Sequence, residues 1–411
     1  MLAVSINFRI VIFVFLLFHT NLLHLFIPNI SIYLELIFST LLLLLVFISI
    51  RPLEINFFLY VALIISVFSL LIGVYNGWYL IDIIGDSYRY VAIFFAYAVG
   101  LKVLGKLDIN DVNLLIRILL FIFIISLIVT FVFLVKTVFI DQLPLFTYET
   151  RIDLSTYPIL FIFLYLNFVN RPISRNNKLF FFSTIMFIVV GLVNLSKAFM
   201  IELFIYLIIP LFILKKHIIN TLLILLIGII CFIGYNLLQD RLVPMFEAIY
   251  NFNNLSNRFN LDTSTSARLL EANAVIASFS NNILMLFTGY GNGALLTDLL
   301  KTDGISPSNF RDNGGLHHIH IEHLLILYRN GIIGLLFYLY WQFYIVKISM
   351  YRINDYLHIN RTMSLFAVAI GSYFIVNMFI AFTNGAFYGK LINGLLAALI
   401  TKIYYLNKNY E

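Results

Sequence analysis

A cluster of histidines stands directly before an apolar segment in the last quarter of the chain. The stretch HHIHIEH, residues 317–323, contributes His317, His318, His320 and His323 together with Glu322. Histidine titrates near neutral pH, so its ring can take a proton from a hydroxyl group or contact an anion. His320 and His323 are three residues apart and would share one face of a helix. This pattern favours acid–base chemistry at a boundary between water and membrane.

Two other interpretations of the histidine cluster stay open. Imidazoles at helical spacing beside a carboxylate can bind zinc, but the chain has no HExxH motif and only one cysteine. We therefore expect no metal ion and no cofactor. Alternatively, the cluster is simply the start of an interfacial helix, where a histidine keeps one edge in water.

Three cations are expected on the same side of the membrane as the histidines. Arg268 opens a predicted amphipathic helix, where its guanidinium and the first helical amides could bind a phosphate together. Lys197 lies in NLSKAFM, a hinge between two apolar segments, and Arg329 lies one to two turns inside the helix after the histidines. Charges at membrane depth are costly and indicate function, although each side chain could also merely extend to lipid headgroups.

The glycine-rich stretch GYGNG, residues 289–293, is not a dinucleotide-binding fingerprint. It has no preceding strand and no βαβ context, and its third glycine is at the wrong spacing. We interpret it as a turn whose backbone amides approach a ligand.

Composition indicates what must position these residues. Of 411 residues, 62% are hydrophobic and only 11% are charged, and apolar runs of about twenty residues recur along the chain. Such runs predict an all-α, polytopic membrane protein, because lipid leaves only helices or closed barrels and these runs lack the alternation of barrel strands. The net charge of +6 is explained by cytoplasmic loops, so we expect membrane lipids and no nucleic acid as partners.

Hydropathy predicts twelve membrane-spanning helices. Their approximate ranges are 7–27, 31–50, 55–74, 88–101, 112–135, 154–170, 179–195, 198–214, 218–238, 323–346, 362–382 and 388–406. The short basic connectors fall on one side, which the positive-inside rule makes cytoplasmic together with both termini.

The chain therefore divides into three predicted parts. Residues 1–238 carry nine helices, residues 239–322 form a long outer loop with the active-site region, and residues 323–411 carry the last three helices. From Thr265 to Phe287 the apolar residues recur with helical spacing. This spacing predicts an amphipathic helix on the outer bilayer face, capped by a hydroxyl of TSTS and ended by the GYGNG turn.

The motifs and their order resemble the O-antigen ligase and polymerase superfamily, which includes the Wzy-type polymerases and WaaL-type ligases of bacterial surface polysaccharide synthesis. Members carry a serine followed by a basic residue at an outer hinge, as Ser196-Lys197 does here. They also carry an arginine roughly twenty residues before a G-x-G turn, as Arg268 stands before residues 289–291.

A third motif is a histidine eleven residues before a GIIG-like helix segment, as His320 stands before residues 331–334. The resemblance covers residues 190–345. Two positions depart from the family pattern: Ile321 follows the histidine in place of asparagine, and Arg329 replaces an acidic residue.

The resemblance implies an activity. Such proteins transfer a glycan from undecaprenyl pyrophosphate to a sugar hydroxyl on the periplasmic face of the bacterial inner membrane, without a required metal. It implies His320 as the base and Arg268 with Lys197 as the pyrophosphate-binding pair. Supporting roles fall to His317, His318, His323, Ser196, Arg329, Gly289 and Gly291. A chain-length regulator is an implied partner.

Three functions remain in competition. A polymerase, which joins lipid-linked repeat units, comes first, and a second outer loop with Lys136, Arg151 and Asp153 slightly favours it. A ligase that transfers glycan to lipid A-core is the second. A polysaccharide or lipid transporter is the third, although the polar residues gather in one outer loop rather than at mid-membrane.

Overall fold

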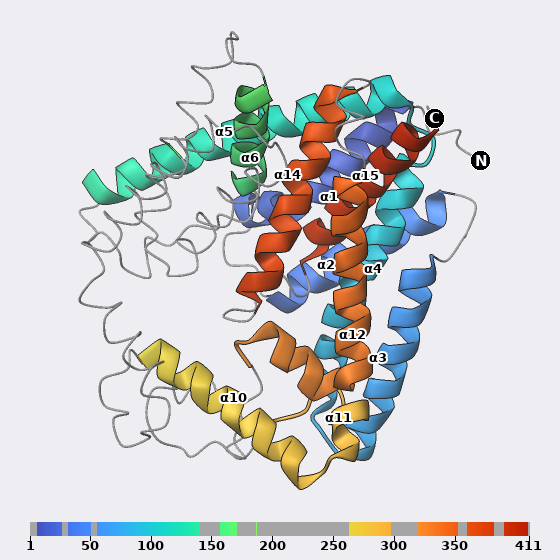
Figure 1. Cartoon of the computed structure of the whole chain (residues 1–411), viewed down its shortest axis with the longest axis vertical. Helices are drawn as coiled ribbons and strands as arrows, with labels where there is room; N and C mark the ends of the chain where they lie inside the picture. The colour runs from blue at the N-terminus through green and yellow to red at the C-terminus, as the bar shows by residue number, and fades with distance from the viewer. Residues whose placement is uncertain are drawn as a thin grey trace.

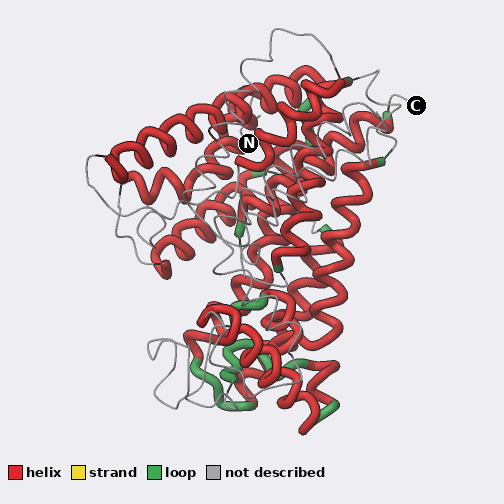
Figure 2. The backbone as a smooth tube through the Cα atoms, turned by 60° about the vertical axis from the view of Figure 1, so that its left-hand side comes forward, coloured by secondary structure: helices red, strands yellow, loops and turns green. Residues whose placement is uncertain are grey.

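The structure is a computed structural model, and it describes residues 6–26, 32–50, 56–139, 157–170, 186, 263–296, 319–351, 360–381 and 390–409. Over these ranges the chain is helical, with no strand (Figure 2). The helices are α1 (Ile6–Phe26), α2 (Ile32–Ser49), α3 (Phe57–Tyr75), α4 (Leu80–Leu104), α5 (Ile109–Phe139), α6 (Tyr157–Asn170), α10 (Thr263–Asn281), α11 (Leu284–Thr288), α12 (Glu322–Met350), α14 (Arg361–Ile380) and α15 (Leu391–Lys408). The predicted all-α class is confirmed.

Most predicted membrane helices coincide with helices of the structure. The predicted ranges up to residue 170 correspond to α1 to α6, and the last three correspond to α12, α14 and α15. The three predicted helices between 179 and 238 lie outside the described residues. Helix α4 begins at Leu80, eight residues earlier than predicted, and α5 continues to Phe139, so Lys136 lies in its last turn rather than in a loop.

Five of the described helices are long and apolar enough to cross a membrane. They are 57–75, 80–104, 109–132, 322–350 and 361–380. The chain is therefore a multi-pass membrane protein.

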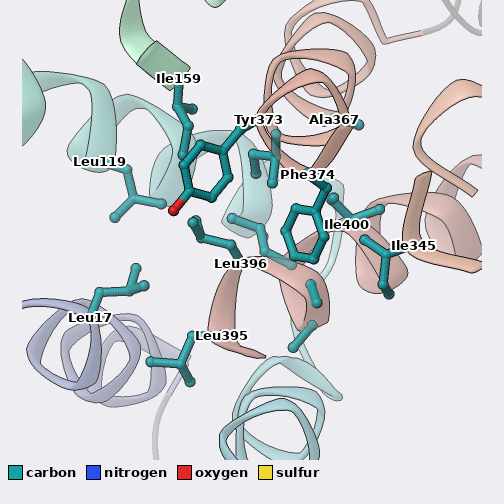
Figure 3. Close-up of a cluster of buried hydrophobic side chains, with 14 of the residues drawn as sticks. Leu17, Leu119, Ile159, Ile345, Ala367, Tyr373, Phe374, Leu395, Leu396 and Ile400 are labelled. Atoms are coloured by element: carbon teal, nitrogen blue, oxygen red, sulfur yellow. The ribbon is translucent and has the colours of Figure 1, made fainter. Parts of the chain in front are cut away.

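Aromatic and branched side chains from both halves of the chain form the main core. Trp341 of α12 is fully buried, and its ring lies 5.2 Å from that of Phe94 and 5.7 Å from that of Phe374. Figure 3 shows Tyr373 and Phe374 of α14 facing leucines of α15 in this core. Helices α4 and α15 approach closely because small residues line their contact: a side chain at Gly394 would collide with the carbonyl oxygen of Ile93.

Figure 1 marks both termini at one end of the molecule, and two basic side chains of helices that meet there, Arg9 of α1 and Lys102 of α4, donate to backbone carbonyl oxygens. Arg9 donates to the carbonyl oxygens of Lys102 and Val103 at 3.1 and 3.2 Å. The Lys102 ammonium in turn donates to the carbonyl oxygens of Phe47 and Ile50, both at 3.2 Å. These cations complement the carbonyl ends of α2 and α4. The opposite end of the molecule carries α10, α11 and the start of α12.

We expect these two ends to lie on opposite sides of the membrane, with the basic end in the cytoplasm. In a Cys231→Ser background, Ser280→Cys on the exposed side of α10 should react with an impermeant maleimide in cells with a permeabilised outer membrane. Asn409→Cys, just after α15, should react only after lysis. Equal labelling of both cysteines in intact inner membranes would contradict this topology.

Candidate functional site

A break in helix α12 organises the end of the molecule away from the termini. Gly331 lies inside this helix with φ 67° and ψ −175°, which interrupts the backbone hydrogen-bond ladder. The carbonyl groups of Tyr328 and Arg329, one turn earlier, accept instead from the amides of Tyr290 and Gly291, at 2.8 and 3.1 Å. A backbone polar group left unsatisfied in an apolar environment costs several kcal/mol. The GYGNG turn therefore completes the broken helix.

Glycine is required on both sides of this contact. Gly289 has φ 76°, and a side chain there would collide with the backbone of Arg329. A side chain at Gly331 would collide with the carbonyl oxygen of Phe287. The expectation that the turn offers its amides to a ligand needs correction, because the amides of Gly289 and Gly291 donate to the carbonyl oxygens of Met285 and Arg329.

A buried ion pair lies beside the break. The Nη1 atom of Arg329 donates to Oδ1 of Asp86 on α4 at 2.6 Å, and both side chains are 0% exposed. The second carboxylate oxygen of Asp86 accepts from the amide of Gly293 at 2.8 Å. Arg329 was expected to contact a substrate anion or to extend to headgroups. Instead it joins α12 to α4, and Asp86 is a partner that the sequence did not indicate.

Amides and hydroxyls extend this polar network. Asn292 lies in the turn. Its backbone amide donates to the carbonyl oxygen of Ser69 at 3.0 Å, and its side chain donates to Ser87 Oγ at 2.8 Å. Asn330 donates to Ser69 Oγ at 2.9 Å and to Asn292 Oδ1 at 3.3 Å. The turn is therefore bound to α3, α4 and α12 at once.

The predicted amphipathic helix is present but divided. Helix α10 ends at Asn281 and α11 begins at Leu284, where one helix from Thr265 to Phe287 was expected. The TSTS residues occupy the first turn of α10 instead of preceding it. Arg268 therefore lies in the second turn, half-buried, rather than at the helix opening.

A second apolar cluster holds α10 against the beginning of α12. Its buried members are Ala274, Val275, Phe279, Ala294, Leu296, Ile319, Leu325 and Tyr328. Tyr290 of the turn stacks on Tyr328 at 4.8 Å between ring centroids, and its hydroxyl donates to the carbonyl oxygen of Ser278 at 2.6 Å. This cluster fixes α10 relative to the residues that precede α12.

The same arrangement brings His320 to Glu271 of α10. The ring atom Nδ1 of His320 lies 2.6 Å from Oε1 of Glu271, and the His320 backbone amide donates to Oε2 at 2.9 Å. The carboxylate is 0% exposed, whereas the His320 side chain is 34% exposed. The ring is therefore anchored by a buried carboxylate and is itself one-third exposed.

Sequence reasoning missed Glu271. A signal was present, since Glu271 is the single acidic residue between 263 and 296 and stands three residues after Arg268. That spacing places both side chains on the same face of α10.

His323, another predicted site residue, takes no part in this contact. His320 and His323 were expected to share one face of a helix. Helix α12 begins only at Glu322, so His320 precedes the helix and the two residues share no helix face. His323 is buried, and the neighbouring Glu322 accepts from the hydroxyl of Tyr338 at 2.6 Å. The predicted residues His317, His318, Ser196 and Lys197 lie outside the described residues.

Within the ranges that the structure describes, no group of three His, Cys, Asp or Glu side chains could hold a metal ion. Two histidines of the cluster lie outside those ranges, so the zinc interpretation stays open as an alternative.

A family model described as O-antigen ligase matches residues 181–339. The matched segment contains α10, α11, the GYGNG turn, the His320–Glu271 contact and the break in α12. No curated protein and no solved structure matches the chain. The resemblance predicted from the motifs over residues 190–345 is confirmed.

We expect single replacements in the Arg329–Asp86 ion pair to destabilise the protein strongly. Asp86→Leu or Arg329→Met leaves one buried charge without its partner, which typically destabilises a protein by about 3–5 kcal/mol. The double variant removes both charges and should recover a large part of that loss, but not all, because the Gly293 amide also binds Asp86. Thermal unfolding in detergent measures the three variants. Additive losses in the double variant would contradict a direct pairing.

Proposed function

We propose, because residues 181–339 match the family model described as O-antigen ligase, that this membrane protein is a glycosyltransferase that polymerises oligosaccharide repeat units carried on undecaprenyl pyrophosphate. The family supports the coarser part of this proposal, an O-antigen ligase or polymerase type of activity on lipid-linked glycans. The donor, the acceptor and the roles of single residues are inferences from the site.

The observation that carries the proposal is the placement of His320. Its side chain is one-third exposed and is anchored by Glu271, and it stands just before α12, whose start lies at the end of the molecule opposite the termini (Figure 1). A general base needs such a geometry, because it must reach the hydroxyl from which it takes the proton.

In the proposed reaction, an acceptor sugar hydroxyl attacks the anomeric carbon of the donor. Its proton passes to His320, a new glycosidic bond forms, and the bond between that carbon and the pyrophosphate oxygen breaks. Undecaprenyl pyrophosphate leaves with the bonding electrons. The site must therefore stabilise negative charge on the pyrophosphate as the bond breaks.

Arg268 is the proposed partner of the pyrophosphate. Its guanidinium can bind two phosphate oxygens at once, and it lies on the face of α10 that also carries Glu271. Lys197, with Ser196, is assigned to the same group by the family spacing, and His317 and His318 are secondary candidates. Because these cations supply positive charge, we propose that transfer needs no metal ion.

The proposed location is the bacterial inner membrane, with α10 and His320 facing the periplasm and both termini in the cytoplasm. The position of Arg9 and Lys102 on helices that meet at the opposite end supports this orientation. A chain-length regulator is a proposed protein partner.

The second candidate is a ligase that transfers the glycan to lipid A-core. The family description, O-antigen ligase, favours it. The sequence argument for a polymerase was a second outer loop with Lys136, Arg151 and Asp153. The structure weakens this argument, because Lys136 lies in helix α5, and residues 151 and 153 lie outside the described ranges. A transporter, the third possibility from sequence, is disfavoured because the family is one of enzymes.

Incubation of the purified protein with lipid-linked repeat units in detergent tests these candidates together. A polymerase should give a ladder of longer lipid-linked glycans with or without EDTA, and His320→Ala should reduce the rate by about a hundred- to ten-thousand-fold. Product formed only after lipid A-core is added would indicate the ligase. Substrate that stays chemically unchanged under all conditions would contradict both enzymatic functions.

Arg268→Lys tests the proposed pyrophosphate contact. An ammonium keeps the charge but cannot bind two phosphate oxygens in the fork geometry of arginine, so we expect activity to fall about tenfold or more. Ser280→Ala, on the exposed side of the same helix, is the control. Normal polymer yield from Arg268→Ala at normal protein levels would contradict this role.

A further inference from the structure

We propose that Glu271 is the positioning residue of the transfer reaction: its carboxylate fixes His320 in the tautomer that carries the proton on Nδ1, so that Nε2 receives the proton of the acceptor hydroxyl. The inference rests on the proposed function of His320 as the base. Glu271 touches His320 and not the substrate, and it acts through the ring.

The two contacts between these residues determine the tautomer. The backbone amide of His320 can only donate, so Oε2 of Glu271 accepts it at 2.9 Å. The remaining oxygen, Oε1, lies 2.6 Å from Nδ1, a short hydrogen bond. An ionised carboxylate has acceptors only, so Nδ1 must supply the proton. In a neutral imidazole the other nitrogen, Nε2, is then the acceptor.

The two residues of the pair differ in burial. Glu271 is 0% exposed, while 34% of the His320 side chain is exposed. The buried carboxylate therefore anchors the ring through Nδ1, while part of the His320 side chain stays accessible from outside. Because Glu271 binds both the ring and the backbone of His320, rotation of the imidazole would break a hydrogen bond.

The proton balance is simple. The hydroxyl proton moves to Nε2 as the glycosidic bond forms, which makes His320 positively charged. The proton on Nδ1 and the charge on Glu271 do not change, and the nearby negative carboxylate stabilises the imidazolium. Release of the Nε2 proton to water restores the base. This division of labour is the one that a buried carboxylate has beside a catalytic histidine in serine hydrolases.

The fold holds Glu271 where this role requires it. Glu271 lies one turn before Val275 and two turns before Phe279, which belong to the apolar cluster between α10 and α12. Ile319, the residue before His320, is buried in the same cluster. Both partners of the hydrogen bonds are therefore fixed by one patch of packing.

Glu271→Gln is the decisive variant. A glutamine amide has one acceptor oxygen, so it can satisfy the His320 backbone amide or Nδ1–H, but not both. We expect kcat to fall by up to about ten-thousand-fold, the loss that the wrong tautomer causes in the serine hydrolases, while KM for the lipid-linked donor changes less than about twofold. Glu271→Asp keeps both acceptors and should recover part of kcat.

Glu322→Gln is the matched control. It makes the same change at a neighbouring buried carboxylate, where the glutamine oxygen can still accept from the hydroxyl of Tyr338. We expect kcat to stay near the wild-type value. A merely structural contact at Glu271 would instead lower the thermal stability or raise KM while leaving kcat unchanged, and that result would overturn the proposal.

A second measurement does not depend on activity. Nitrogen-15 NMR of histidine-labelled protein, with the His320 signals identified by their loss in His320→Ala, distinguishes the two tautomers. We expect the Nδ1–H form in the wild type and a shift towards the Nε2–H form in Glu271→Gln. The Nε2–H form in the wild type would overturn the proposal. Full activity of His320→Ala would overturn the proposed function itself, which separates the two failures.

Discussion

The backbone of α12 cannot be left open where it breaks. Tyr328, Arg329 and Gly331 are buried away from water, so the carbonyl groups released at the break must be satisfied by protein. The GYGNG turn supplies the amides of Tyr290 and Gly291, and each neighbouring feature follows from that contact. Positive φ angles and close approach require glycine at 289 and 331, and Tyr290 is brought to stack on Tyr328. The base of the proposed reaction stands at the start of the helix that this turn completes.

Polar groups around the break form one connected network rather than isolated contacts. Asp86 accepts from both Arg329 and the amide of Gly293, so the same carboxylate fixes the helix and the turn. Asn292 and Asn330 extend the connection to α3 and α4. These shared partners hold the turn, α3, α4 and α12 together as one unit, which restrains the helix that directly follows His320.

The sequence revealed the helices much better than the partners of the site. Membrane helices such as α3 and α14 were predictable because a run of about twenty apolar residues is a local signal. The beginning of α4 was missed because Asp82 and Asp86 interrupt the hydropathy, although both are buried among neighbouring helices. His320 and Arg268 were identifiable from residue type and spacing. Their partners were not, since Asp86 is 243 residues from Arg329 and Glu271 is 49 residues from His320. Pairings over such separations depend on tertiary packing, which no local pattern encodes.

Arg329 and Asp86 are in contact in space but far apart in the sequence, and this distance along the chain also affects how the protein assembles. Helix α12 carries a buried guanidinium that is expensive to place in lipid alone, and its counterion enters the membrane much earlier, on α4. The second half of the protein therefore becomes stable in the bilayer only after it has found the first half. A copy in which α4 is misplaced would leave the buried Arg329 guanidinium without its counterion, so the ion pair links the correct placement of α4 to the stability of the whole helix bundle.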